Sequence, residues 1–189
     1  SSITLGAGQF CTNPGLIIVK DSSLSDKFIK DLSLKLDKTD KQCMLHPNII
    51  KNFIEKSNYV EKLEGVTRIT NNNVFENNFV MPQVCSVSAN NFLKNKIYQT
   101  EVFGPFSLFV KCKTYNEMIK VIDNLEGQLT GTVMVNIEDK DFINNIINAL
   151  EVKVGRVIFN GVPCSSIILF KFISWKDNSP LSFMLNSSE

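Results

Sequence analysis

The chain has 189 residues, 43% of them hydrophobic and 21% charged, which fits one globular domain and excludes a disordered chain, a collagen-like repeat and a coiled coil. Lysine and arginine number 20 and aspartate and glutamate 19, so the net charge of +1 disfavours nucleic-acid binding through bulk charge. No apolar run approaches the roughly 18 residues needed to cross a bilayer. The first residues also lack the basic region and apolar core of a signal peptide. We therefore expect neither a nucleic-acid partner nor a membrane partner.

The cysteine and histidine content limits the kinds of site that the chain can hold. There are 5 cysteines, an odd number without CxxC spacing, which argues against both a disulfide framework and a zinc cage. The single histidine, His46, cannot form a histidine-rich metal site. We expect no metal and a reducing, cytoplasmic location.

The first hundred residues predict alternating strands and helices. In chain order these are a strand at 16–20, a helix at 25–37, a helix beginning at Pro47, polar strand and loop at 61–78, and a strand at 79–88. Ser25 is the expected cap of the first helix, and His46 the residue at which the second begins. Pro82 is expected to interrupt the last strand, since proline cannot donate to a β-ladder.

The second half gives the clearest pattern. It predicts a strand at 106–113, a helix after 114, a strand at 128–136, a helix at 142–150 and a strand at 156–160. Thr114 and Glu117 form a capping box, and Gly127 and Gly155 are expected to end the two helices. Apolar strands that alternate with helices indicate a parallel α/β sheet.

Cys11 is the first candidate for chemistry. A thiolate is the most nucleophilic side chain available near neutral pH, and the glycines around Cys11 leave room for a substrate. On these grounds alone, a cysteine among glycines is more often a small buried residue than a nucleophile.

Four ordered blocks change that interpretation. They are GQFCTNPGL at 8–16, EVFGP at 101–105, GQLT at 127–130 and GRVIFNGVP at 155–163. Together they resemble the aldehyde dehydrogenase superfamily, in particular the branch with α-ketoglutaric semialdehyde dehydrogenases and bacterial fatty aldehyde dehydrogenases. Joint chance matching of four blocks in order is far less probable than a match to any one of them.

The resemblance implies that Cys11 is the nucleophile. It would attack the carbonyl of a small-molecule aldehyde to give a thiohemiacetal, with its own backbone N–H helping to hold the oxyanion. Loss of hydride to the nicotinamide would leave a thioester that water hydrolyses.

The same resemblance assigns the residues around the cofactor. Glu101 would hydrogen-bond the nicotinamide ribose, Phe103 would line the nicotinamide site, and Gly104 and Pro105 would shape that loop. Asn160 would give structural support near the site. Outside this family, Glu101 would be interpreted as a solvated carboxylate and Phe103 as core packing.

The resemblance also implies the domain organisation. Residues 1–163 would be the three-layer α/β catalytic domain with a mainly parallel sheet. The N-terminal dinucleotide-binding domain, with its oxyanion-hole asparagine and general-base glutamate, is expected to be absent. NADP is favoured over NAD as the cofactor, and full-length relatives are expected to be homo-oligomers.

The tail at 164–189 departs from the family pattern. At Ser174-Trp175 the family has His-Gly. If Ser174 is encoded by TCA, the codons TCA-TGG read one base later give His-Gly. We therefore hypothesise a frameshift near residue 164 and a tail that does not belong to the fold.

Two other functions stay open from the sequence. One is a non-enzymatic truncated remnant, since the isolated chain is expected to be inactive in cofactor-dependent aldehyde oxidation. The other is a weak thiol esterase that uses Cys11 alone. The cysteines at 43, 85 and 112 are expected to be packing thiols.

Overall fold

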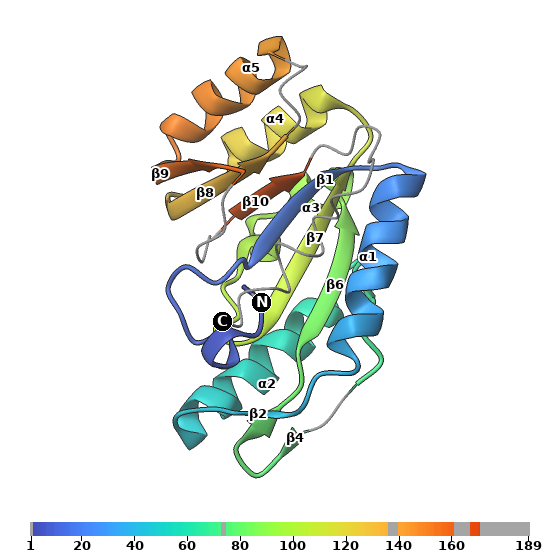
Figure 1. Cartoon of the computed structure of the whole chain (residues 1–189), viewed down its shortest axis with the longest axis vertical. Helices are drawn as coiled ribbons and strands as arrows, with labels where there is room; N and C mark the ends of the chain where they lie inside the picture. The colour runs from blue at the N-terminus through green and yellow to red at the C-terminus, as the bar shows by residue number, and fades with distance from the viewer. Residues whose placement is uncertain (1, 73–74, 136–139, 161–166, 171–189) are drawn as a thin grey trace.

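A computed structural model describes residues 2–72, 75–135, 140–160 and 167–170. Its centre is a seven-stranded sheet in the order β3-β6-β7-β1-β10-β8-β9 (Figure 1). The strands are β1 (Leu16–Lys20), β3 (Thr67–Arg68), β6 (Gln83–Ser88), β7 (Phe106–Cys112), β8 (Gln128–Met134), β9 (Val154–Phe159) and β10 (Ile167–Phe170). All neighbours pair in parallel except β3 with β6. The prediction of a mainly parallel sheet is confirmed.

A small antiparallel sheet lies beside the main one. It contains β2 (Gln42–Cys43), β5 (Phe79–Val80) and β4 (Phe75–Glu76) in that order. Pro82 separates β5 from β6, so the expected interruption is confirmed, and the two halves join different sheets.

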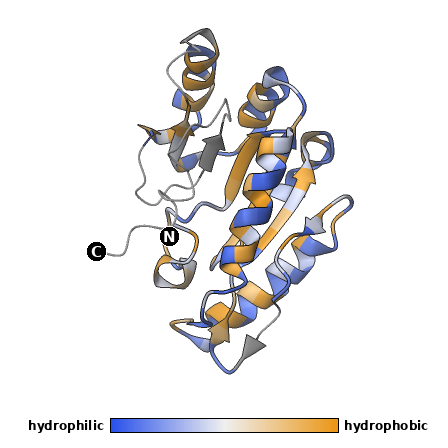
Figure 2. Cartoon of the chain, turned by 45° about the vertical axis from the view of Figure 1, so that its right-hand side comes forward, coloured by the Kyte–Doolittle hydropathy of each residue, from blue (hydrophilic) through white to orange (hydrophobic). Residues whose placement is uncertain are grey.

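Helices cover both faces of the large sheet. They are α1 (Ser23–Leu36), α2 (Pro47–Glu61), α3 (Ala89–Lys94), α4 (Tyr115–Asn124) and α5 (Lys140–Glu151), with 3₁₀ turns η1 (Leu5–Gly8) and η2 (Lys96–Gln99). In β1, Ile17 packs in one core with Phe28 of α1, and its neighbour Ile18 packs in the other core with residues of α2 to α5. Figure 2 shows hydrophobic strands between helices that carry hydrophobic and hydrophilic residues in alternation. This confirms the three-layer arrangement, because successive strand residues face opposite layers.

Some helix ends differ from the sequence-based expectation. Ser22, and not Ser25, caps α1; its hydroxyl accepts from the Ser25 N–H at 3.2 Å while the Ser25 hydroxyl accepts from the Ser22 N–H at 3.0 Å. Ser25 therefore completes a capping box from within the first turn. His46 does begin α2, where its Nδ1 accepts from the Asn48 N–H at 3.1 Å.

The helices α4 and α5 end before the glycines expected to stop them. The helix α4 ends at Asn124, three residues before Gly127, and Gly155 lies inside strand β9. The Thr114 hydroxyl accepts from the Glu117 N–H, as a cap should, but the Glu117 carboxylate accepts from Lys113 N–H at 2.7 Å rather than from Thr114.

Within the tail, residues 167–170 form β10, which pairs in parallel with β1 and β8, so the expectation that the tail does not belong to the fold is wrong for these four residues. Residues 164–166 and 171–189 lie outside the described residues, and the frameshift stays a prediction. In the part of the chain that the structure describes, no helix has the length and apolarity to cross a membrane.

Candidate functional site

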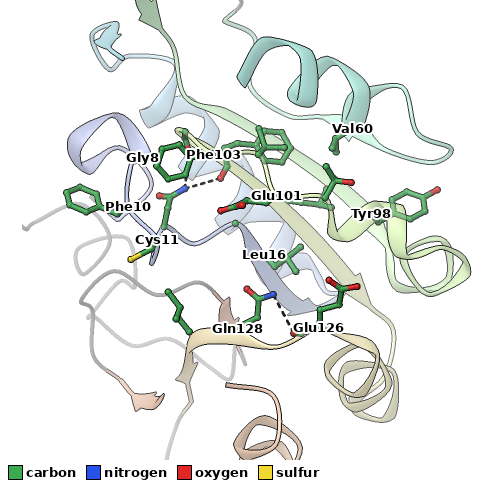
Figure 3. A pocket seen from close by; sticks show the side chains of 18 of the residues that line it. Gly8, Phe10, Cys11, Leu16, Val60, Tyr98, Glu101, Phe103, Glu126 and Gln128 are labelled. Atoms are coloured by element: carbon green, nitrogen blue, oxygen red, sulfur yellow. Dashed lines mark hydrogen bonds between the residues drawn. The ribbon is translucent and has the colours of Figure 1, made fainter. Parts of the chain in front are cut away.

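A pocket of about 390 Å³ opens at the amino ends of three parallel strands. The first residues of β1, β7 and β8, namely Leu16, Phe106 and Gln128, all line it. Cys11 and Glu101 line it too, from the loops that precede β1 and β7 (Figure 3). Three of the four sequence blocks therefore meet at one hollow.

Cys11 lies on a tight turn before β1. The Asn13 N–H donates to the Phe10 carbonyl oxygen at 3.0 Å, which places Cys11 and Thr12 at the two central positions. The Cys11 side chain is exposed at the pocket. A substrate in the pocket therefore has access to the sulfur.

A glycine contact brings the Cys11 loop against the loop before β7. Gly8 has a φ of +64°, and a Cβ at this position would lie 2.4 Å from the Gly104 carbonyl carbon and oxygen. Gly104 is equally confined, since a Cβ there would lie 2.4 Å from the Phe53 ring. Only glycine allows this backbone conformation and this close approach together.

Hydrogen bonds extend that contact along β7. The Asn13 side-chain Nδ2 donates to the Gly104 carbonyl at 3.0 Å, and the Ser107 hydroxyl donates to the Pro14 carbonyl at 2.7 Å. The Leu108 N–H then donates to the Gly15 carbonyl at 2.9 Å. The Cys11 loop is therefore joined to segment 104–108 as a unit.

Gln99 holds the third block in place. Its Nε2 donates to the Asn124 carbonyl at 3.0 Å, and its Oε1 accepts from the Glu126 N–H at 3.0 Å. Gln99 is two residues before Glu101. These bonds therefore hold the segment that leads into β8, and its first residue Gln128, close to the segment that contains Glu101.

The predicted cofactor residues differ in exposure. Glu101 is exposed at the pocket, and Phe103 is half-buried in its wall. Gly104 and Pro105 are buried beneath them, and the Pro105 carbonyl accepts from the Gln83 N–H at 2.8 Å. The exposed Glu101 carboxylate and the partly exposed Phe103 ring thus lie next to a turn that is buried and hydrogen-bonded to β6.

Asn160 lies apart from these residues and does not line the pocket. It follows β9 with a φ of +43°, and its side chain donates to the Val135 carbonyl and accepts from the Val135 N–H, both at 3.0 Å. The Asn160 side chain therefore connects the segment after β9 to the segment after β8 through two hydrogen bonds.

The other cysteines divide into two kinds. Cys85 and Cys112 are buried, and burial raises the pKa of each thiol to about 12, as expected for packing thiols. The expectation was wrong for Cys43, which is exposed because β2 is a two-residue strand at the surface. Cys164 lies outside the described residues.

Sequence reasoning missed Asn13 and Glu126, which also line the pocket. The Asn-Pro-Gly turn at 13–15 is the signal that would have drawn attention to Asn13. The usual rule for open α/β sheets, which looks for ligands at the carboxyl ends of strands, would have led to the opposite edge.

Comparison with known proteins agrees with the four sequence blocks. The family model for the aldehyde dehydrogenase family matches residues 1–178. An α-ketoglutaric semialdehyde dehydrogenase of Azospirillum brasilense is 35% identical over 163 residues, which cover 86% of this chain and 31% of that protein. A similar enzyme of Acinetobacter baylyi is 30% identical over 165 residues, with the same coverage of 86% and 31%. The chain thus spans about a third of the length of these relatives.

Solved structures agree in fold. An aldehyde dehydrogenase of Bacillus cereus matches with a TM-score of 0.69 and 18% identity, covering 87% of this chain and 34% of that one. A betaine aldehyde dehydrogenase of Staphylococcus aureus, solved with NAD⁺, matches with a TM-score of 0.64 and 24% identity, covering 82% and 32%. With the family match over residues 1–178, these findings lead to one conclusion: the chain belongs to the aldehyde dehydrogenase family.

Proposed function

We propose that this chain is the catalytic domain of an NAD(P)-dependent aldehyde dehydrogenase in which Cys11 carries the acyl group. The observation that supports this most strongly is the pocket itself. An accessible thiol, a carboxylate and a half-buried aromatic ring line one hollow, although Cys11 and Glu101 are 90 residues apart in sequence. Buried Cys85 and Cys112 cannot replace Cys11, because they lack access and their thiols stay protonated.

The proposed reaction begins with the Cys11 thiolate. Its sulfur bonds to the aldehyde carbon, the carbonyl π-electrons move to oxygen, and a thiohemiacetal forms. The backbone N–H of Cys11 helps to hold that oxyanion. When the carbon loses hydride, the C=O bond re-forms and leaves a thioester on Cys11. Water then adds to the thioester carbon and the C–S bond breaks, which releases the carboxylate and one proton and restores the Cys11 thiol.

The residues around Cys11 suit a nicotinamide cofactor. The Glu101 carboxylate can accept hydrogen bonds from ribose hydroxyls, and the Phe103 ring offers an apolar wall to a flat ring. The bound nicotinamide supplies one chemical step, the acceptance of the hydride. In this proposal Glu101 and Phe103 orient that ring, Gly104 and Pro105 fix the loop beneath them, and Asn160 supports the neighbouring strands.

The matched relatives guide the finer assignments. The names of the relatives support an aldehyde substrate. From the resemblance of the four sequence blocks, we further propose NADP in preference to NAD, a cytoplasmic enzyme and homo-oligomers of the full-length protein. We also propose that residues 1–163, whose sheet is completed by β10 of the tail, form the catalytic domain and that a dinucleotide-binding domain complements it. The chain spans only about a third of its relatives' length, so we expect no aldehyde oxidation by these 189 residues alone.

An activated ester tests the nucleophile without a cofactor. With p-nitrophenyl acetate, we expect a burst of about one equivalent of p-nitrophenolate as the Cys11 thiol is acylated. Cys11→Ser should abolish the burst, and Cys43→Ser, which changes another exposed cysteine, should retain it. A burst that survives Cys11→Ser would contradict the proposal.

Glu101→Gln tests the cofactor role. We expect weaker binding of NADP⁺ or NAD⁺, measured by titration calorimetry in the presence of the complementing dinucleotide-binding domain, with an unchanged ester burst of the chain alone. Glu64→Gln is the matched control, because Glu64 is exposed and pairs with Lys94 at 3.5 Å away from the pocket lining. Equal cofactor affinity in the wild type and Glu101→Gln would rule out this role.

A further inference from the structure

We infer that Asn13 is a positioning residue, which holds the turn that carries Cys11 against the loop that carries Glu101 and Phe103. The inference rests on the proposed function of Cys11 and adds to it the residue that sets the geometry of the pocket. Asn13 is two residues after Cys11 and lines the same pocket.

The backbone of Asn13 fixes the nucleophile turn from its C-terminal side. Its N–H donates to the Phe10 carbonyl at 3.0 Å, and its own carbonyl accepts from the Gly15 N–H at 2.8 Å. The first bond closes the turn around Cys11. The second ties that turn to the entry of β1. The Cys11 Cα therefore moves with Asn13.

The side chain of Asn13 reaches the opposite loop. Its Nδ2 donates to the Gly104 carbonyl at 3.0 Å and lies 3.4 Å from the Phe106 carbonyl, which also accepts from it. Both groups are acceptors only, so the NH₂ end of the amide must face them. The Oδ1 atom is buried and accepts no hydrogen bond from the described residues.

This bond is placed where it determines the spacing of the pocket. Gly104 directly follows Phe103 and is three residues after Glu101, so a shift of the Gly104 carbonyl moves both pocket residues. The Gly8–Gly104 contact brings the two backbones together but supplies no directional bond. The bond between Ser107 and Pro14 joins residues that do not line the pocket. Asn13 is therefore a side-chain link between the two pocket walls.

The substitution Asn13→Asp tests this role, because it keeps the shape and removes the donor. An ionised carboxylate would face two carbonyl oxygens and push the loops apart. We expect the efficiency of Cys11 acylation by p-nitrophenyl acetate to fall roughly 10- to 100-fold, since small displacements of a reacting group have effects of this size. Alkylation of Cys11 by iodoacetamide, which needs an accessible thiolate but no alignment with the opposite loop, should change little.

The pH dependence separates positioning from general loss of structure. A protonated carboxyl has an O–H that donates to Gly104 again. The acylation efficiency of Asn13→Asp relative to wild type should therefore rise as the pH falls from about 8 to about 5, because burial beside carbonyl oxygens raises the carboxyl pKa above its ordinary value of about 4. Dividing each acylation rate by the iodoacetamide rate of the same variant at the same pH removes differences in thiol reactivity that are unrelated to alignment.

One control matches the change. Asn52→Asp adds the same charge at an exposed position of α2 and should retain acylation efficiency. Buried Cys85 and Cys112 report folding, because they resist iodoacetamide only in the folded chain. If Asn13→Asp exposes them, Asn13→Ala, which adds no charge, is measured in its place and should show the same loss of acylation at unchanged alkylation.

The outcomes distinguish this inference from the proposed function. A wild-type burst that depends on Cys11, together with wild-type efficiency in the folded Asn13 variant, would overturn the positioning role alone. Absence of any Cys11-dependent burst in the wild type would overturn the proposed function first. A folded Asn13→Asp variant with low efficiency that recovers at low pH is the result we expect.

Discussion

Replacing Gly8 by alanine should separate the two loops that form the pocket. The added methyl would lie 2.4 Å from the Gly104 carbonyl carbon and oxygen and 2.5 Å from the Pro105 nitrogen. These are backbone atoms, so no side chain can rotate away to relieve the contact. Moving from 2.4 Å to an ordinary contact of 3.4 Å requires a shift of about 1 Å between the loops.

The cost has two parts. A non-glycine residue in the left-handed region is disfavoured by about 1–2 kcal/mol. Forcing an extra methyl into a packed site costs about 1–3 kcal/mol more. Alanine at Gly8, where φ is +64°, should therefore lower the free energy of unfolding by about 2–5 kcal/mol.

Urea denaturation measures this loss directly, with the midpoint compared at constant slope. Gly15→Ala is the matched control in the same loop, because a methyl added there would meet no atom within 4 Å beyond its chain neighbours, and the φ of Gly15 is not in the left-handed region. The control should stay within about 0.5 kcal/mol of wild type. If Gly8→Ala proves as stable as Gly15→Ala, the close approach of Gly8 to Gly104 is wrong.

Three further results follow from the described side chains. Iodoacetamide should label exposed Cys11 and Cys43 in the folded chain, whereas Cys85 and Cys112 should react only after unfolding. Peptide mass spectrometry detects the labelled cysteines, and labelling of Cys85 or Cys112 in the folded chain would contradict their burial in the core. The free energy of unfolding should fall as the pH rises from about 9 to about 12. Thiols of the unfolded chain lose their protons near pH 9, whereas buried Cys85 and Cys112 hold theirs to about pH 12, so each thiol can lower the free energy of unfolding by up to about 4 kcal/mol across this range. A free energy of unfolding that stays constant with pH in urea denaturation would refute the burial of these thiols. Ser22→Ala should lower stability by about 1 kcal/mol through loss of the α1 cap, and an unchanged urea midpoint would argue against the capping box.

The periodic parts of the sequence predicted the fold well. The strand at 16–20 and the helix after Pro47 were predicted from the spacing of their apolar residues. The strand is buried on both faces between the helix layers, and the helix buries one face against the sheet. Helix ends were less predictable. Ser22 and Ser25 both have a hydroxyl at the start of α1, and only the backbone conformation decides which one caps it. Gly127 was wrongly predicted to stop α4, because α4 already ends at Asn124 and its C-cap Leu125 has extended backbone angles.

The site was predictable only in part, for a different reason. The four sequence blocks identified Cys11, Glu101 and Phe103, and the structure gathers them at one pocket. Asn13 escaped notice because its significance lies in a hydrogen bond to a residue 91 positions away, which no local pattern contains. Asn160 was identified, but only three-dimensional pairing shows that its amide binds the Val135 backbone instead of facing the pocket.

The location of the acyl group after reaction with an activated ester tests the central claim most directly. The chain is treated with p-nitrophenyl acetate, quenched in acid to preserve thioesters, digested and mapped by mass spectrometry. We expect one acetyl group on the peptide that contains Cys11, and little on Cys43, which is also exposed. An acetyl group divided evenly between Cys11 and Cys43, or found mainly on another residue, would contradict it.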